Sequence, residues 1–445
     1  MLFIILFFKF PPVIIQKIMY INILQNATPS GLRLQVTQHW CRTHLAYVRS
    51  TKYLCVSVWF RNPCFNRSLS GLRILRVDNF GGRQLPTGAF STLSELTELA
   101  LISGSLSALN EGDLDSQRGS LRTLVLHGNE LSEVPTAALS GATMLRNLDL
   151  SRNRIRSLPP DAFAGTVNLD VVDLSNNGLG GSDSLDPDAF RGVLDRLRTL
   201  TMRSCQIGDR DMSALSSLHA VSELTLSYNA IANLPADLFD RMRSLRRLRL
   251  DNNRLQSVTR STFSGTTSST LELLDLAHNP LSSGVPADAF LDLNYLQELR
   301  LDGVKTIQLG SNSFSTQQQR ALRTLSLRGS GLGDRLWPIL STLEGLGTLS
   351  ASDCSIPSIP DFALRRNTAL QTIDLSSNSV DSLTQSSVYG LQGSLNAINL
   401  YSNRISTVHQ CTFYGFRSAL PVVREINCSK CQNQNRLYIQ SVTVT

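Results

Sequence analysis

The sequence predicts an α/β solenoid, a curved stack of short units with a parallel β-sheet on the concave face and mostly irregular or 3₁₀ structure on the convex side. The frame Leu-x-x-Leu-x-Leu recurs about fourteen times, at intervals of 24 to 26 residues apart from one interval of 28 around residues 180–183. A fixed period of this length indicates stacked repeats rather than separate globular domains. Apolar residues make up 42% of the chain and aromatic residues only 7%, so the core must be mainly aliphatic.

Each position of a repeat has a physical role that follows from its residue type. In the unit that starts at Leu145, Leu148 and Leu150 alternate as in a short strand with one face inward. Asn153 turns the chain and hydrogen-bonds neighbouring backbone. One repeat cannot bury its own apolar face, so the units must stack on their neighbours. The frames start at Leu72, Leu96, Leu121, Leu145, Leu169, Leu197, Val221, Leu245, Leu271, Leu296, Leu322, Leu346, Leu370 and Leu395, and Leu420 opens a degenerate fifteenth.

Six units lack the asparagine of the turn. Cysteine is an accepted substitute there, so Cys205 and Cys354 are predicted to be buried free thiols without a redox role. The other substitutions predict local irregularity, above all between residues 296 and 345, where the curvature is expected to change or the sheet to loosen. The six residues at this position are Phe80, Gly104, Cys205, Val304, Ser330 and Cys354.

A second motif identifies the class of repeat. Leu-Pro-x-x-x-Phe follows the turn at 158–163 and 234–239, with Val-Pro-x-x-x-Phe at 285–290. Over residues 72–419 the chain resembles the 24-residue leucine-rich repeats of Toll receptor ectodomains, matrix proteoglycans and neuronal adhesion proteins. The resemblance implies a protein of the extracellular space or cell surface. It also implies that the side chains between the strand leucines bind a protein on the concave face.

The N-terminal flank is predicted to comprise a hydrophobic leader and a cap. Residues 1–24 are mostly apolar but are interrupted by Lys9, two prolines and Lys17, so no run is long enough for a spanning helix. A secretory signal peptide is the preferred interpretation, with a signal anchor or a wrongly assigned start as alternatives. Residues 25–71 form the cysteine-containing cap that covers the first repeat.

Cysteines flank the repeats at both ends, and residues 420–445 are expected to form an incomplete C-terminal cap. Related extracellular proteins close their caps with disulfide bonds, which indicates an oxidising compartment. Three cysteines at each end allow one bridge per cap and leave one thiol over. Cys428-x-x-Cys431 with His409 and Cys411 could alternatively be drawn as a zinc site, but no metal is predicted. The disulfide candidates are Cys41, Cys55, Cys64, Cys411, Cys428 and Cys431.

Three glycosylation sequons lie in these flanks, at Asn26, Asn66 and Asn427. Sugars at these positions would leave the concave face open, and Asn66 is the one expected to be used. Membrane anchoring is expected only through the N-terminal segment or through a region beyond Thr445, where a complete cap or an anchor would follow in a longer gene product.

The net charge of +7 comes from the flanks. Residues 1–70 hold eight basic residues and no acid, whereas residues 71–416 hold 30 basic and 34 acidic residues. Binding to a phosphate backbone needs basic residues gathered on one face, so no nucleic-acid partner is predicted.

The central repeats carry the most structured polar cluster at positions expected on the concave face. Arginine and tyrosine often anchor interfaces, and Arg249, Asp275 and Arg300 occupy the same position in successive strands. The alternative is a self-neutralising ladder of charges on a solvated face. The predicted protein-binding residues are Arg203, Tyr228, Arg247, Arg249, Asp275, His278, Arg300 and Arg328, with Asp251 beside them.

No catalytic constellation is found, and neither an enzyme activity, a catalytic substrate nor a cofactor is predicted. The glycines at 329, 331 and 333 match phosphate-binding loops only weakly and fall in a repeat turn. The sequence therefore predicts a non-enzymatic scaffold that binds a protein ligand in adhesion, matrix organisation or receptor signalling. The alternative is an intracellular leucine-rich scaffold of an enzyme complex, against which the phenylalanine position and the flanking cysteines argue.

Overall fold

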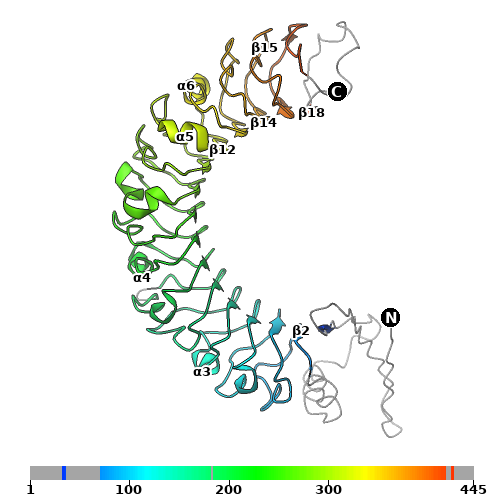
Figure 1. Cartoon of the computed structure of the whole chain (residues 1–445), viewed down its shortest axis with the longest axis vertical. Coiled ribbons are helices and arrows are strands. Elements are labelled where there is room, and N and C mark those ends of the chain that lie inside the picture. Colours follow the sequence, from blue (N-terminus) through cyan, green and yellow to red (C-terminus); the bar gives the residue numbers. More distant parts are fainter. Residues whose placement is uncertain (1–32, 37–70, 182–183, 417–421, 425–445) are drawn as a thin grey trace, which may run out of the picture. The chain divides into compact units, whose positions relative to one another are not determined.

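The computed structural model describes residues 33–36, 71–181, 184–416 and 422–424. The chain divides into two compact units, residues 1–221 and 222–445. Each unit is a stack of one-turn repeats, with the strands on one side and short helices or irregular segments on the other (Figure 1). This is the predicted α/β leucine-rich-repeat solenoid.

In the first unit, seven described strands pair in parallel and in chain order. Strand β1 precedes the first predicted repeat and adds to the sheet at β2, in the region expected to form the N-terminal cap. The strands are β1 (Arg33–Val36), β2 (Ile74–Asp78), β3 (Glu98–Ile102), β4 (Thr123–Val125), β5 (Asn147–Asp149), β6 (Val171–Asp173) and β7 (Thr199–Thr201).

In the second unit, the strands from β8 to β14, then β16 and β18, follow one another in chain order in the parallel sheet, and β15 and β17 form a separate two-stranded sheet. Strand β18 lies where the degenerate fifteenth repeat was predicted and pairs with β16. The strands are β8 (Glu223–Thr225), β9 (Arg247–Arg249), β10 (Leu273–Asp275), β11 (Glu298–Arg300), β12 (Thr324–Ser326), β13 (Thr348–Ser350), β14 (Thr372–Asp374), β15 (Ser382–Leu383), β16 (Ala397–Asn399), β17 (Thr407–Val408) and β18 (Val422–Arg424).

Within the described residues, the connections between strands hold only short helices, which agrees with the predicted irregular or 3₁₀ side. The first unit contains η1 (Asp115–Gln117), α3 (Thr136–Leu139), η2 (Arg191–Val193), η3 (Asp209–Asp211) and α4 (Met212–Leu215). The second contains η4 (Arg260–Phe263), η5 (Gly265–Ser269), α5 (Thr316–Ala321), η6 (Gly333–Arg335) and α6 (Leu336–Leu340).

The turn asparagines form a ladder of hydrogen bonds between repeats. Asn153 is 8% exposed, and its amide nitrogen donates to the carbonyls of Leu126, 3.0 Å away in the preceding repeat, and of Leu150 at 2.9 Å. Its amide oxygen accepts from the Leu131 backbone N–H at 3.0 Å. One side chain thus satisfies three backbone groups that would otherwise be buried without a partner, as predicted.

The two cysteines that replace asparagine have the predicted character. The Cys205 thiol donates to the Leu174 carbonyl at 3.1 Å and the Cys354 thiol to the Leu327 carbonyl at 2.9 Å, so each keeps one bond of the ladder. Both are free and buried. Burial raises the pKa of the Cys205 thiol to about 12, which keeps it protonated and unreactive.

In the described repeats, the turn after each strand contains one residue in the left-handed backbone conformation. The residue just before the asparagine position has a φ between +52° and +76° in all fourteen predicted units. Glycine, asparagine, aspartate and serine fill most of these places because they tolerate this conformation best. The prediction recognised the asparagine but not this second requirement of the turn.

Phenylalanine fills the interior on the side opposite the strands. Phe163 and Phe190 stack with ring centroids 5.6 Å apart, and Phe239 and Phe263 at 5.9 Å. All four rings are about 1% exposed or less. The phenylalanine of the predicted motif is therefore a buried contact between consecutive repeats.

The expected loosening of the sheet between residues 296 and 345 is wrong. Strands β11, β12 and β13 pair over three residues each in unbroken register. Val304 and Ser330 replace asparagine there, and both are buried. The irregularity falls on the opposite side, where α5 and α6 replace the extended connection, because the strand pairing depends on the backbone and on the buried leucines.

Candidate functional site

Apart from Arg203, the predicted cluster lies in the second unit, on the strand face, where side chains flank the buried strand leucines. Arg247 and Arg249 flank Leu248, which is 0% exposed. The register places Asp275 between Arg249 and Arg300, as predicted from the repeat frame. We call Arg247, Arg249, Asp275, Arg300 and Arg328 the strand-face patch.

Asp275 is the buried member of the strand-face patch. The residue is 6% exposed and its carboxylate accepts from the Ala277 backbone N–H at 3.1 Å. The Arg300 guanidinium lies 3.8 Å from it, at the limit of an ion pair. Burial raises the pKa of this carboxyl to about 6, with a further upward contribution from Asp251 that Arg300 opposes.

Two arginines of the strand-face patch form ion pairs with carboxylates that were not among the predicted residues. Arg300 contacts Glu298 at 2.5 Å on its own strand, and Arg247 contacts Glu223 at 2.8 Å on the neighbouring strand. Glu298 and Glu223 occupy the position before the strand leucine, the same column as the predicted Arg247, so reading that column through every strand could have found them.

Arg249 and Arg328 have weaker ion-pair contacts with carboxylates than Arg247 and Arg300 have. Arg328 lies 3.8 Å from Asp374, two strands away, and its guanidinium also approaches the Ser350 hydroxyl at 3.4 Å. Among the described residues, no carboxylate forms an ion pair with Arg249. The self-neutralising ladder is therefore present only in part, and Arg249 and Asp275 do not pair with each other.

The remaining predicted residues, like Arg328, lie just beyond the ends of strands. Tyr228 and His278 occupy the left-handed position of the turn, with φ of +60° and +56°, and both are exposed. The His278 ring covers Gly303, where a Cβ would come within 2.9 Å of its Nδ1 atom. Arg203 is exposed just beyond β7 in the first unit. A left-handed conformation costs a residue with a large side chain on the order of 1 kcal/mol, so Tyr228 and His278 each carry a backbone penalty of this size.

Asp275 predicts a measurable pH dependence of stability. Its pKa is about 6 in the folded protein, against about 3.9 for an unfolded aspartate, so the folded state binds more protons between these values. Its contribution to stability is therefore largest below about pH 4, falls as the pH rises to about 6, and stays low above that.

Asp275→Asn removes this titration while it keeps an acceptor for Ala277. We expect the stability of the variant relative to the unsubstituted protein to increase between about pH 4 and pH 6 and to level off above. Urea unfolding at four pH values between 4 and 7.5 measures it. A difference that stays constant over this range would show that Asp275 does not titrate there.

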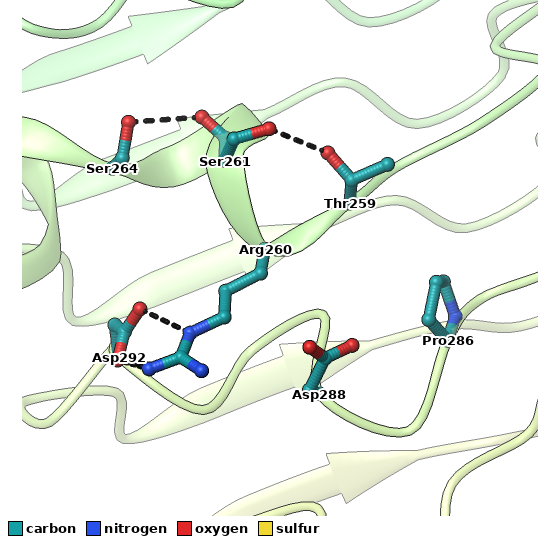
Figure 2. A pocket seen from close by; sticks show the side chains of 7 residues that line it. All are labelled: Thr259, Arg260, Ser261, Ser264, Pro286, Asp288 and Asp292. Carbon is teal, nitrogen blue, oxygen red and sulfur yellow. Dashed lines mark hydrogen bonds and ion pairs between the residues drawn. The ribbon is translucent and has the colours of Figure 1, made fainter.

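A shallow pocket lies beside η4, away from the strand face (Figure 2). It is an open depression, and the Arg260 guanidinium at its edge donates to both carboxylate oxygens of Asp292 at 2.7 and 2.8 Å. Arg191 and Asp161 form a similar bidentate pair in the first unit. Such pairs join neighbouring repeats and need no ligand. The depression is lined by Thr259, Arg260, Ser261, Ser264, Pro286, Asp288 and Asp292.

The predicted disulfides and sugars fall mostly outside the described residues. Cys411 is half-buried and its thiol is free. The other five candidates, Cys41, Cys55, Cys64, Cys428 and Cys431, lie outside the described part of the chain, as do the sequons at Asn26, Asn66 and Asn427. The disulfide and glycosylation sites therefore stay predictions.

In the described ranges, no group of three or more histidine, cysteine or acidic side chains is placed to hold a metal ion. No helix in the same ranges has the length and apolar character needed to cross a membrane.

Comparisons with known proteins agree with the architecture. The sequence profile of the family described as "Leucine rich repeat" matches residues 119–179, 195–255 and 243–303, and that of the "BspA type Leucine rich repeat region (6 copies)" matches residues 342–434. Together these matches cover more than half of the chain.

The chain is similar in sequence to podocan-like protein 1 of Homo sapiens, with 31% identity over 73% of this chain and 66% of that protein. It is also similar to Tsukushi of Mus musculus, with 32% identity over 37% of this chain and 46% of that protein. The chain thus spans just under two thirds of the first relative and about half of the second.

Two solved structures share the fold. The complex of TLR13 with ssRNA13 gives a TM-score of 0.53 at 21% identity and covers 77% of this chain and 59% of the other. The Toll–Spatzle complex of Drosophila gives a TM-score of 0.51 at 16% identity and covers 79% of this chain and 47% of the other.

Proposed function

The chain belongs to the leucine-rich repeat proteins, and from that premise we propose that it is a non-enzymatic scaffold that binds a protein ligand through its strand face, outside the cell or at its surface. The observation that carries this proposal is the strand-face patch. It presents Arg247 and Arg249 on β9 and Arg300 on β11, with Asp275 of β10 between Arg249 and Arg300, so the strand register fixes their spacing.

The chemistry of the strand-face patch suits a protein ligand. Arginine and tyrosine are enriched among the residues that dominate binding energy at interfaces. Arg249 has no carboxylate in ion-pair contact among the described residues, so it can bind an acidic group of a partner without first losing an internal ion pair. Exposed Tyr228 lies in the turn after the neighbouring strand β8 and adds an aromatic contact.

The relatives support the same kind of function. The similarity to podocan-like protein 1 and Tsukushi, together with the buried phenylalanine of the 24-residue repeat, favours the extracellular class. The Toll–Spatzle structure is a complex of two proteins, which supports a protein ligand. The TLR13 structure contains ssRNA, but residues 71–416 of this chain hold more acidic than basic residues, which disfavours binding of a phosphate backbone there.

The extracellular assignment predicts how the chain behaves on expression with its own N-terminal segment. We expect a secreted or surface-bound product whose apparent mass falls on treatment with peptide N-glycosidase, because the sequons at Asn26, Asn66 and Asn427 pass through the secretory pathway. Asn66→Gln should remove the largest part of that shift. A reduced, unglycosylated product in the cytosol would contradict the assignment and favour an intracellular scaffold.

The ligand itself can be sought directly. The purified chain, biotinylated at one terminus, is tested by surface binding against an array of secreted proteins and cell-surface ectodomains. We expect saturable binding to a protein ligand at protein concentrations below about 1 µM, the range of specific interfaces of ordinary size. Absence of any such ligand would count against the proposal.

A further inference from the structure

The segment Arg241–Arg249 is the most basic stretch of the described chain. Its nine residues include five arginines and no acid. The segment leads from the side opposite the strands, around the edge of one repeat, into strand β9. Arg241, Arg243, Arg246 and Arg247 are exposed and Arg249 is half-buried, so all five guanidinium groups belong to a surface of one repeat.

These charges are only partly neutralised within the protein. Arg246 forms an ion pair with Glu272, and Arg247 with Glu223. In the described part of the second unit, no carboxylate forms an ion pair with Arg241, Arg243 or Arg249. The next repeat borders the segment with residues 264–271, which contain hydroxyl groups and no charge. Two of these hydroxyls are bonded to the backbone of the segment's repeat, from Thr266 to Asp240 and from Thr270 to Leu245, each at 2.7 Å.

The apolar residues of the segment face inward. Met242, Leu245 and Leu248 are each 0% exposed. The exposed surface of the segment thus consists of arginines and Ser244. A protein partner usually needs a buried aromatic or aliphatic anchor, which this edge lacks. A single-stranded nucleic acid is usually bound with aromatic side chains that stack on its bases, and residues 240–251 contain no aromatic residue.

We propose that Arg241, Arg243 and Arg246, continued by Arg247 and Arg249, form a binding site for a sulfated polysaccharide. A sulfate group offers several oxygens to the planar guanidinium group, which binds such anions through two parallel hydrogen bonds. Five arginines along a continuous edge suit a chain of regularly spaced anions. The site shares Arg247 and Arg249 with the strand-face patch, whereas Arg241, Arg243 and Arg246 lie outside that patch and are therefore the residues tested.

The test uses heparin as the sulfated probe and the full chain as the protein. We expect retention on immobilised heparin at physiological salt and a steep loss of affinity as salt increases, since the contacts are ionic. R241Q/R243Q/R246Q should bind about tenfold more weakly, because three exposed charge contacts are lost.

A matched control separates the site from overall charge. R154Q/R191Q/R260Q removes the same number of charges outside the segment Arg241–Arg249, from arginines that pair with Glu130, Asp161 and Asp292. It should bind heparin like the unsubstituted protein, and circular dichroism should show both variants folded.

Three results would overturn the proposal. They are absence of retention at physiological salt, equal weakening by both triple variants, and equal binding of heparin and fully desulfated heparin. Stronger binding to single-stranded RNA than to heparin would instead identify a nucleic-acid site and would also overturn it. None of these results depends on the protein ligand of the strand-face patch.

Discussion

Asn378→Ala is expected to destabilise the second unit by about 4 kcal/mol, because it leaves several buried backbone groups without a partner. The Asn378 amide oxygen accepts from the backbone N–H groups of Cys354 and Ile356 at 2.9 and 3.0 Å. Its amide nitrogen donates to the carbonyls of Ala351 and Leu375, both at 2.9 Å. The side chain is buried at 7% exposure, so water cannot replace these bonds at low cost.

Two other variants make this prediction specific. Asn396→Ala is the same chemical change at an exposed position of the next repeat, and it should change stability by less than about 0.5 kcal/mol. Asn378→Cys should fall between the two, since the thiols of Cys205 and Cys354 each keep one donor bond at this position. Urea unfolding followed by circular dichroism gives the three values. Equal stabilities of N378A and N396A would refute the role of the ladder.

The loss of stability in Asn378→Ala should first appear near the substituted repeat. Each repeat contacts only its neighbours, so removal of one rung weakens the contacts on either side of residue 378 before it affects distant repeats. Hydrogen exchange should therefore increase first in β13, β14 and β16.

Much of the fold could be predicted from the spacing of the leucines. The positions equivalent to Leu148 and Leu150 are buried in each unit because alternation turns one face inward, and each of the fourteen predicted frames contains a described strand. The left-handed turn residue was not predicted, since Ser, Asn, Gly and Arg share that position without a common polarity. A second set of buried amides was also missed. Gln117 and Gln318 each donate to two carbonyls of the preceding repeat from the side opposite the strands.

The sequence predicts which residues of the candidate site lie side by side on neighbouring strands, but it does not predict which of them form ion pairs. The frame puts Arg249, Asp275 and Arg300 side by side because register is common to all repeats. Which acid a guanidinium group contacts depends on rotamers and on the second column of the sheet. Arg300 therefore lies closer to Glu298 than to Asp275, at 2.5 against 3.8 Å.

Charge reversal in the strand-face patch should have the largest effect on ligand binding. We expect R249E/R300E to weaken binding of the protein ligand by about 100-fold, because arginines at the centre of an interface often contribute 2 kcal/mol or more. The neutral variant R249Q/R300Q should lose about tenfold, which separates the loss of contacts from repulsion between like charges. R365E/R366E has the same change in charge at two exposed arginines of the same unit, outside its strands, and should bind normally.

The most direct test of the account is the affinity of these variants for the ligand found in the ectodomain array, measured by surface binding with folded, full-length protein. We expect R249E/R300E to lose about 100-fold in affinity and R365E/R366E to stay within about twofold of the unsubstituted chain. Equal affinities of R249E/R300E and the unsubstituted chain, or equal losses in the two reversal variants, would contradict the claim that this protein binds its ligand through the strand face.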